Sequence, residues 1–286
     1  MKIAHISDIH VRNYKYHHEY REVFQQLFDK LKELKPDVIV NTGDTAHTKS
    51  ILSPEYFNLT SWLFTNLAEI APLHMILGNH DCNVKNSSRL DAITPITEAL
   101  EDPNIHFHKN TKEVDLGENI VLNVLSILDQ DKWSAPSDPN KTNLALYHGA
   151  VAGSKTDTGW IMEHGEIDIQ IVDDHGKARY PGSLIQQNFG ESLDKGFLLW
   201  DIKDKENFTC DFHQLTNPKP FVTINLTPKG GIPKGLSPPA GARLRLVSSN
   251  NQSIEIFRKA VDIAKKRFKP ESISFLNRAH GGERIS

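Results

Sequence analysis

Residues 3–10 read IAHISDIH, an apolar run that ends in the polar cluster Asp8-Ile9-His10. Three further apolar runs also end in polar clusters: 38–42 in Gly43-Asp44, 73–77 in Gly78-Asn79-His80-Asp81, and 144–147 in His148-Gly149. Short apolar runs of this length indicate buried parallel strands. Because open α/β sheets bind their ligands at the carboxyl ends of the strands, the four clusters predict one shared site.

The clusters offer carboxylate, imidazole and amide groups, and none of them contains a cysteine. These donors suit a hard to borderline divalent ion, whereas thiolates are typical of a structural zinc site. The mixture of oxygen and nitrogen donors favours manganese, with magnesium as the alternative. Four such clusters predict a hydrolytic site with two divalent cations.

The chain has 286 residues, 38% of them apolar, which is enough for one large domain and a small one. Its two cysteines, Cys82 and Cys210, exclude a disulfide framework. The N-terminus shows no basic flank or cleavage site, and no apolar run approaches the roughly 18 residues that cross a bilayer. We therefore expect an intracellular, cytoplasmic protein without a membrane role, located in the host cytoplasm if it comes from a phage.

Helices and strands alternate in the first part of the chain. Helical spacing of apolar residues predicts a helix over 17–34, which Pro36 separates from the next strand. A second helix is expected after Ser53 as N-cap, with Pro54 at the first helical position, and a third from about Ser88 to Leu100. This alternation indicates βαβ units with right-handed crossovers.

The pattern then changes to strands, which are expected at 105–108, 120–128, 144–147, 167–172, 197–202 and 208–215. A polar stretch with Pro136 and Pro139 predicts a surface loop between the second and third of these. The combination predicts a two-sheet β-sandwich flanked by helices, with the metal-binding loops at one edge.

A domain boundary is expected near Asn217. The remaining sequence predicts a compact α+β unit, with strands at 221–226, 243–247 and 273–276 and a helix at 253–268. From Gly241 to Ser286 ten basic residues stand against four acidic ones, a net charge of +6 in a chain whose net charge is −3. Such a surplus is typical of a phosphate-contacting surface or of a solvated helix face, and the sequence favours neither.

The order D-x-H, G-D, G-N-H-D and H-G resembles that of the calcineurin-like metallophosphoesterase superfamily. Later segments resemble SbcD-type DNA repair and recombination nucleases, including phage exonuclease subunits: Tyr180-Pro181-Gly182-Ser183, Phe189-Gly190-Glu191 and Lys195-Gly196-Phe197. The resemblance covers residues 1–202, and the C-terminal unit resembles the capping domain of those nucleases more loosely. It implies a four-layer metallophosphoesterase β-sandwich flanked by helices at 1–217, with a small α+β DNA-capping domain at 218–286.

Chemistry and the resemblance together assign five metal ligands. Two cations about 3.5 to 4 Å apart need a bridging anion, and Asp44 is expected to supply it. Asp8 and His10 would form most of the shell of the first ion, while Asn79 and His148 would hold the second. Water between the ions would lose its proton more readily than bulk water and would attack the phosphorus in line.

The resemblance also assigns His80 as the general acid or phosphate-stabilising residue, with Asp81 as a candidate to orient it. Asp81 could equally cap the next helix, and His148 could be a satisfied core histidine. Four further histidines alternate with apolar residues, and we expect them to be structural: His5, His74, His106 and His108.

One element of the resemblance is missing from the sequence. The family closes its site with Gly-His-x-His, or Gly-Asp-x-His, just before the Pro-Gly-Ser turn, and residues 167–181 contain neither. Either the segment has been deleted, or the protein contains residues that this sequence omits, or His175 with Asp173 or Asp174 supplies the ligands. The intact flanking motifs, and the high cost of losing a strand from a close-packed sheet, favour a deleted or omitted segment.

The sequence therefore predicts a manganese-dependent DNA nuclease subunit that cleaves phosphodiester bonds at or near DNA ends, in repair, recombination or replication. By resemblance it would form a homodimer and act with an SMC-like ATPase, as in SbcCD-type complexes. Two alternatives stay open. One is a catalytically impaired module that binds DNA ends and docks the ATPase, and the other is a phosphomonoesterase of the same superfamily.

Overall fold

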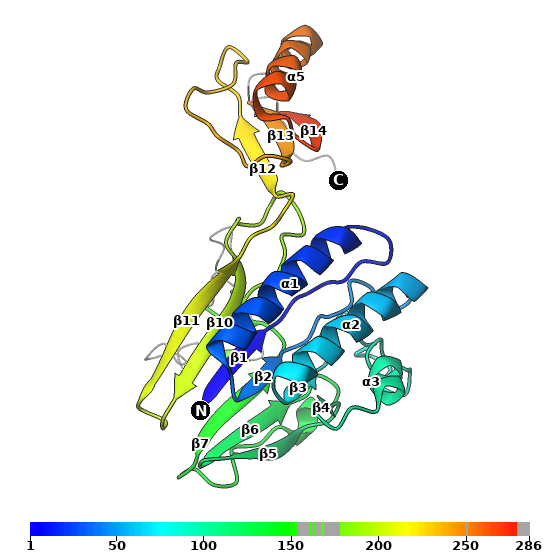
Figure 1. The fold of residues 1–286 in the computed structure, drawn as a ribbon, viewed down its shortest axis with the longest axis vertical. Coiled ribbons are helices and arrows are strands. Elements are labelled where there is room, and N and C mark those ends of the chain that lie inside the picture. Colours follow the sequence, from blue (N-terminus) through cyan, green and yellow to red (C-terminus); the bar gives the residue numbers. More distant parts are fainter. Residues whose placement is uncertain (154–160, 162, 164–166, 169–177, 250, 279–286) are drawn as a thin grey trace. The chain divides into compact units, whose positions relative to one another are not determined.

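The computed structural model describes residues 1–153, 161, 163, 167–168, 178–249 and 251–278 (Figure 1). The chain divides into two compact units. The first comprises Met1–Ile185 and Asp194–Thr216, and the second comprises Gln186–Leu193 and Asn217–Ser286. A segment from the middle of the chain thus belongs to the C-terminal unit.

A six-stranded sheet forms the centre of the first unit, in the order β11-β10-β1-β2-β3-β4. Its parallel strands are β1 (Lys2–Ile6), β2 (Val38–Asn41), β3 (Leu73–Ile76) and β4 (Ile105–His108). The strands β10 (Lys195–Ile202) and β11 (Phe208–Leu215) add to the other side of β1 in antiparallel orientation. The carboxyl ends of β1, β2 and β3 therefore lie at one edge of the sheet.

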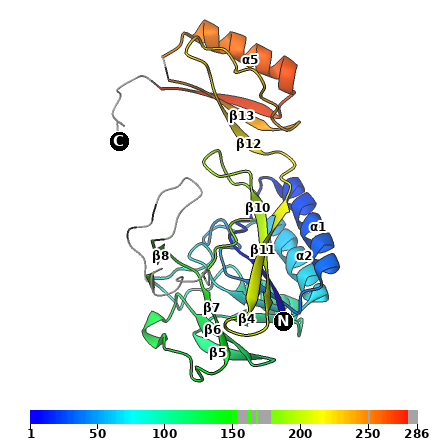
Figure 2. The same cartoon turned by 90° about the vertical axis from the view of Figure 1, so that its left-hand side faces the viewer.

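Helices α1 (His17–Leu34) and α2 (Pro54–Ile70) cover one face of this sheet (Figures 1 and 2). The helix α1 follows the predicted bounds, and its apolar stripe is buried at Tyr20, Phe24 and Phe28. The Ser53 hydroxyl accepts the amide proton of Tyr56 at 3.1 Å, so the predicted N-cap is confirmed.

The third helix is shorter than predicted. It was expected from about Ser88, but α3 spans Thr94–Leu100. The Asp91 carboxylate accepts the amide protons of Ile93 and Thr94 at 2.9 and 2.7 Å. Asp91 competes with helical backbone bonds in this way, so the residues before Thr94 form turns.

A second sheet packs on the opposite face of the first and completes the predicted sandwich (Figure 2). It consists of β5 (Lys112–Gly117), β6 (Ile120–Leu125) and β7 (Thr142–Tyr147), with the short 3-10 helix η1 (Gln130–Lys132) before β7. The core between the sheets contains apolar side chains from both: Ile3, Val38, Val40 and Ile76 from the first, and Ile120, Leu122, Val124 and Leu146 from the second.

Two small differences from the predicted strands concern this region. The strand β5 was not predicted, because its sequence KEVDLG carries charges and its side chains are mostly exposed. Of the strand expected at 167–172, only β9 (Ile167–Asp168) is described, and it pairs in parallel with β8 (Val151–Ala152).

In its described residues, the second unit consists of a three-stranded parallel sheet and one helix. The strands β12 (Phe221–Asn225), β13 (Arg243–Ser248) and β14 (Ser272–Asn277) pair in this order, and α5 (Ile254–Phe268) packs on the sheet through Phe257, Ala260, Ala264 and Phe268. Gln186 ties the segment 186–193 to this unit, because its side-chain amide donates to the carbonyl of Phe221 and accepts that residue's N–H.

Among the described residues, no helix has the length and apolar character needed to cross a membrane.

A buried pair of histidines links β3 to β4. His74 Nδ1 and His108 Nε2 share a hydrogen bond of 2.9 Å, and the His106 ring lies 4.5 Å from the His74 ring. Burial, with the nearby Lys112 and the other histidines, lowers the pKa of His74 to about 4 and that of His108 to about 3. Both side chains are therefore neutral in the folded protein at pH 5, whereas the unfolded chain protonates them below about pH 6.5.

We expect acid to destabilise the first unit through this pair. Each histidine makes the free energy of unfolding fall by up to about 1.4 kcal/mol per pH unit below pH 6.5, until its folded-state pKa is reached. In His108→Gln, denaturant unfolding measured at pH 7 and pH 5 should show a smaller loss of stability. His18→Gln is the matched control, because the His18 side chain is 87% exposed. An unchanged pH dependence in His108→Gln would contradict this account.

Candidate metal centre

The loops that follow β1, β2, β3 and β7 converge at one edge of the sandwich. Backbone hydrogen bonds hold the first two loops together beyond the strands, from Asp8 N to the Gly43 carbonyl at 3.0 Å and from His10 N to the Asp44 carbonyl at 2.9 Å. The structure brings together all of the side chains predicted for the site: Asp8, His10, Asp44, Asn79, His80 and His148.

Asp44 lies at the centre of this arrangement and is 3% exposed. Its Oδ2 lies 3.7 Å from His10 Nε2 and 3.4 Å from His148 Nε2. Its Oδ1 accepts the backbone N–H of His80 at 2.8 Å. One carboxylate therefore faces two imidazoles from different loops through the same oxygen.

In the part of the chain that the structure describes, two groups of side chains have the spacing that a metal ion needs, and both include Asp44. One group is Asp8, Asp44 and His148, and the other is His10, Asp44 and His80. The first of these combines Asp8 with His148, whereas the sequence places Asp8 with His10. His10 Nε2 nevertheless lies 3.7 Å from Asp8 Oδ1, so the two ligands from the first loop remain neighbours.

His148 is held in one orientation by a backbone carbonyl. Its Nδ1 donates to the Thr42 carbonyl at 2.8 Å, which leaves Nε2 facing Asp44 and the Asn79 amide oxygen, 3.2 Å away. A hydrogen bond of this kind on the far ring nitrogen fixes the tautomer of metal-binding histidines. His148 is therefore oriented so that its Nε2 faces two of the other predicted ligands, Asp44 and Asn79.

Two glycines allow the loops after β2 and β3 to approach closely. A Cβ on Gly43 would lie 2.5 Å from the backbone nitrogen of Gly78, and Gly43 has a φ of +100°. A Cβ on Gly78 would overlap the carboxylate and the backbone nitrogen of Asp44. Asp44 itself has a φ of +54°, a left-handed conformation that is uncommon for a residue with a side chain and is enriched at functional sites.

The pKa values of the site residues show that Asp44 favours positive charge on the imidazoles around it. Burial alone would lower the pKa of His148, but the hydrogen bond and charge of Asp44 outweigh it and raise the pKa to about 9. Burial would raise the pKa of Asp44, yet His148 and the His80 amide keep it below its usual value. The pKa of His10 is likewise raised, because Asp8 and Asp44 outweigh its burial.

These groups fit divalent cations by the chemistry of their donors. Asp8 and Asp44 have lowered pKa values and His10 and His148 have raised ones, so these carboxylates and imidazoles favour each other's charged forms. Metal binding to histidine and carboxylate displaces such protons. The buried Nδ1 of His10 has no hydrogen-bond partner in the described residues, whereas its Nε2 faces Asp8 and Asp44.

Asp81 does not orient His80 in the structure. Its two carboxylate oxygens accept backbone N–H groups from Ala46 at 2.7 Å and Gly78 at 2.9 Å, so it ties the loop after β2 to the loop after β3. His80 is held by His47 instead, because its Nδ1 donates to the His47 carbonyl at 2.9 Å. Burial raises the pKa of Asp81 to about 6, against the effect of the two backbone donors.

The sequence did not indicate His47, whose ring lies close to those of both His10 and His80. The ring of His47 is 5.8 Å from that of His10 and stacks on that of His80 at 6.2 Å. Arg12 contacts its Nε2 at 3.0 Å. The only signal in the sequence was its position three residues after Asp44 in a loop that carries a ligand.

The remaining histidines and acids of the prediction lie elsewhere. Of the four expected to be structural, none belongs to a metal-capable group within the described part of the chain; His5 contacts the Thr42 hydroxyl at 3.0 Å. The proposed substitutes for the missing closing motif, His175 with Asp173 or Asp174, lie outside the described residues.

Comparison with known proteins agrees with the family resemblance seen in the sequence motifs. Residues 1–207 match the family model described as "Calcineurin-like phosphoesterase". The chain is 33% identical over 298 residues to "Uncharacterized protein R555" of Acanthamoeba polyphaga mimivirus, a match that covers 93% of this chain and 22% of that protein. It is 24% identical over 247 residues to "Putative phosphoesterase 244L" of Invertebrate iridescent virus 6, covering 78% of this chain and 86% of that protein.

This chain therefore spans about a fifth of the length of the mimivirus relative and most of the iridescent virus relative. The family match extends over nearly all of the first unit, including every loop of the metal centre. Members of this family act on phosphoesters and use divalent metals to do so. By its sequence, its sandwich of sheets and its cluster of ligands around Asp44, the chain belongs to the calcineurin-like phosphoesterase family.

Proposed function

We propose that this chain is a DNA nuclease subunit that hydrolyses phosphodiester bonds at or near DNA ends, with two divalent cations and manganese as the preferred metal. The observation that carries the proposal is the position of Asp44, whose Oδ2 faces both His10 and His148. A single carboxylate shared by two groups of ligands is the arrangement that a two-metal site requires.

In this proposal Asp8, Asp44, His148 and Asn79 hold one cation, and His10 with Asp44 holds the other. When bound, the pair of cations supplies an ionised water as nucleophile and neutralises the charge that develops on the phosphate. His80 donates Nδ1–H to the His47 carbonyl. Its Nε2 is then the atom that carries a proton to the leaving oxygen or contacts the phosphate.

The basic character of the second unit supports DNA as the substrate. The helix α5 presents five exposed cationic side chains: Arg258, Lys259, Lys265, Lys266 and Arg267. Clustered Lys and Arg side chains attract a phosphate backbone and give binding that weakens steeply with salt. A phosphomonoesterase for small substrates would not need such a surface. The resemblance of Pro181-Gly182-Ser183 and the following motifs to SbcD-type nucleases adds to this support.

The same resemblance leads us to propose a homodimer that acts with an SMC-like ATPase in DNA repair, recombination or replication. The mimivirus relative is more than four times as long as the part that matches this chain, which leaves room there for further domains. Light scattering of the purified chain tests the dimer. A mass equal to one chain at micromolar concentration would contradict it.

Substitution of Asp44 tests the two-metal nuclease. End-labelled linear duplex DNA is incubated with the wild-type chain and Asp44→Ala, with manganese, with magnesium and with a chelator. We expect cleavage that needs the metal, is faster with manganese, and is abolished in Asp44→Ala, because that variant removes the ligand common to both cations. Titration calorimetry with manganese should show loss of binding in the same variant.

The outcomes of that experiment separate the three candidate functions. DNA binding without cleavage would favour the catalytically impaired end-binding module. Hydrolysis of an aryl phosphate monoester in preference to duplex DNA would favour the phosphomonoesterase. Either result would overturn the nuclease.

His80 should act on the reaction rather than on metal binding. For His80→Ala we expect the rate of DNA cleavage to fall by about 10² to 10⁴, the usual contribution of a general acid, with manganese affinity retained. Cleavage rates and calorimetry of the variant are compared with those of His18→Gln, whose side chain is exposed and belongs to neither of the two groups around Asp44. Loss of manganese binding in His80→Ala would show instead that His80 is a ligand.

A further inference from the structure

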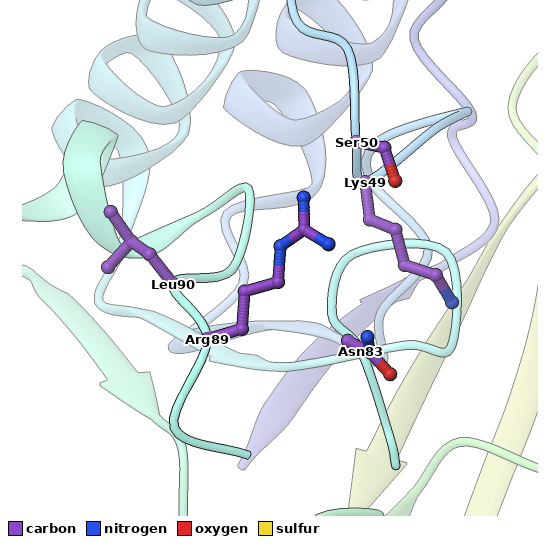
Figure 3. Close-up of a pocket in the computed structure, with 5 residues that line it drawn as sticks. All are labelled: Lys49, Ser50, Asn83, Arg89 and Leu90. Carbon is purple, nitrogen blue, oxygen red and sulfur yellow. The ribbon is translucent and has the colours of Figure 1, made fainter. Parts of the chain in front are cut away.

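A small pocket lies beside the metal centre and is lined by two of the loops that build it (Figure 3). Lys49 and Ser50 come from the loop after β2, which also carries Asp44. Asn83, Arg89 and Leu90 come from the segment after β3, which also carries Asn79 and His80. The pocket is therefore at the same edge of the sheet as the site for the scissile phosphate.

Lys49 connects the pocket directly to the metal centre. Its Nζ donates to the backbone carbonyl of Asn79 at 2.7 Å. This bond holds a cationic group next to a predicted metal ligand. Lys49 thus has a defined position within the exposed part of the loop, residues 48–51.

Among the described residues, no carboxylate lines the pocket or forms an ion pair with Lys49 or Arg89. Asp91, two residues after Arg89, forms an ion pair with Lys109 at 2.9 Å and caps α3 with its other contacts. Asp81 is occupied by two backbone N–H groups. Within the described residues, the Arg89 guanidinium has neither a hydrogen bond nor an ion pair.

Each polar side chain of the pocket has a group that can donate a hydrogen bond. The amide oxygen of Asn83 accepts the backbone N–H of Lys85 at 3.2 Å, which leaves the Asn83 NH₂ group to donate. The Ser50 hydroxyl adds a further donor close to Lys49. An arginine fork, an ammonium group, an amide and a hydroxyl are the groups that bind a phosphate.

Exposed apolar side chains accompany this cationic pocket. Leu90 lines it and is 61% exposed. Ile51 and Val84, which follow Ser50 and Asn83 in the chain, are 71% and 43% exposed. Apolar side chains beside a phosphate site suit a ligand that carries a sugar and a base, and inorganic phosphate would leave them in water.

We propose that this pocket binds the phosphate next to the scissile one along a nucleic-acid strand, with Leu90 against the adjoining sugar or base. The inference rests on the proposed nuclease function and names the substrate more closely. It requires at least two successive phosphates, one at the metal centre and one between Lys49 and Arg89. A monoester or a diester with a single phosphate cannot occupy both.

Fluorescence anisotropy with a short labelled oligothymidylate, in the presence of a chelator, tests the pocket without hydrolysis. Arg89→Ala is the informative variant, because Lys49→Ala would also release the carbonyl of Asn79. We expect its dissociation constant to rise about tenfold. The slope of log affinity against log salt should fall by about 0.7, the value for one single-strand phosphate contact. Arg89→Lys keeps the charge without the fork and should be intermediate.

Lys205→Ala is the matched control. Lys205 is exposed in the turn between β10 and β11, and because Lys2 pairs with Asp201 this turn lies at the end of the sheet away from the metal loops. The control should bind like the wild type. Equal affinity and an equal salt slope in Arg89→Ala and the wild type would overturn the proposal, as would stronger competition by a phosphoserine peptide than by unlabelled oligothymidylate.

Hydrolysis separates this inference from the proposed function. A thymidine trinucleotide has two phosphodiesters and a dinucleotide has one, so the wild type should prefer the trinucleotide and Arg89→Ala should lose that preference. A wild type that cleaves both equally well would overturn the pocket as a subsite. If neither is cleaved but Arg89→Ala weakens oligothymidylate binding as expected, the nuclease proposal fails while the phosphate site stands.

Discussion

The close packing of Gly43 against Gly78 is the constraint on which the metal centre depends. Both positions lack the room for a Cβ, since one would meet backbone and the other would meet Asp44 itself. This approach lets Asp44 accept the His80 amide with one oxygen while its other oxygen faces His10 and His148. A methyl group at either glycine would push the two loops apart and separate the ligands that share this carboxylate.

Much of the framework could be predicted from the sequence because its determinants are local. Apolar runs followed by polar clusters gave the strand ends and the ligands, and Ser53 with Pro54 gave the start of α2. The helix expected from about Ser88 was too long. The Asp91 carboxylate accepts the N–H groups of Ile93 and Thr94, and residue spacing alone does not reveal these bonds. The strand β5 was missed because its charged side chains are exposed at the edge of the second sheet.

The finer arrangement of the site depended on contacts between distant parts of the chain. Asp81 follows His80 directly, yet its partners are the amides of Ala46 and Gly78, and the carbonyl that holds His80 belongs to His47. The sequence also does not show that Arg89 lacks an acidic partner. Asp91, two residues away, would be the expected partner, but in the structure it pairs with Lys109. The spacing of residues in the sequence therefore identified the site residues, whereas only the structure shows which groups they bond to.

The chain passes between its two units three times, after Ile185, Leu193 and Thr216. Gln186 pairs with Phe221 through both groups of its side-chain amide, and Phe189 stacks under Arg245 at 4.1 Å. The C-terminal unit is consequently not encoded by one continuous stretch of the gene. A recombination event that exchanged only the segment after Thr216 would bring in a C-terminal unit without its own residues 186–193. We therefore expect the two units to be inherited together and not exchanged as independent modules.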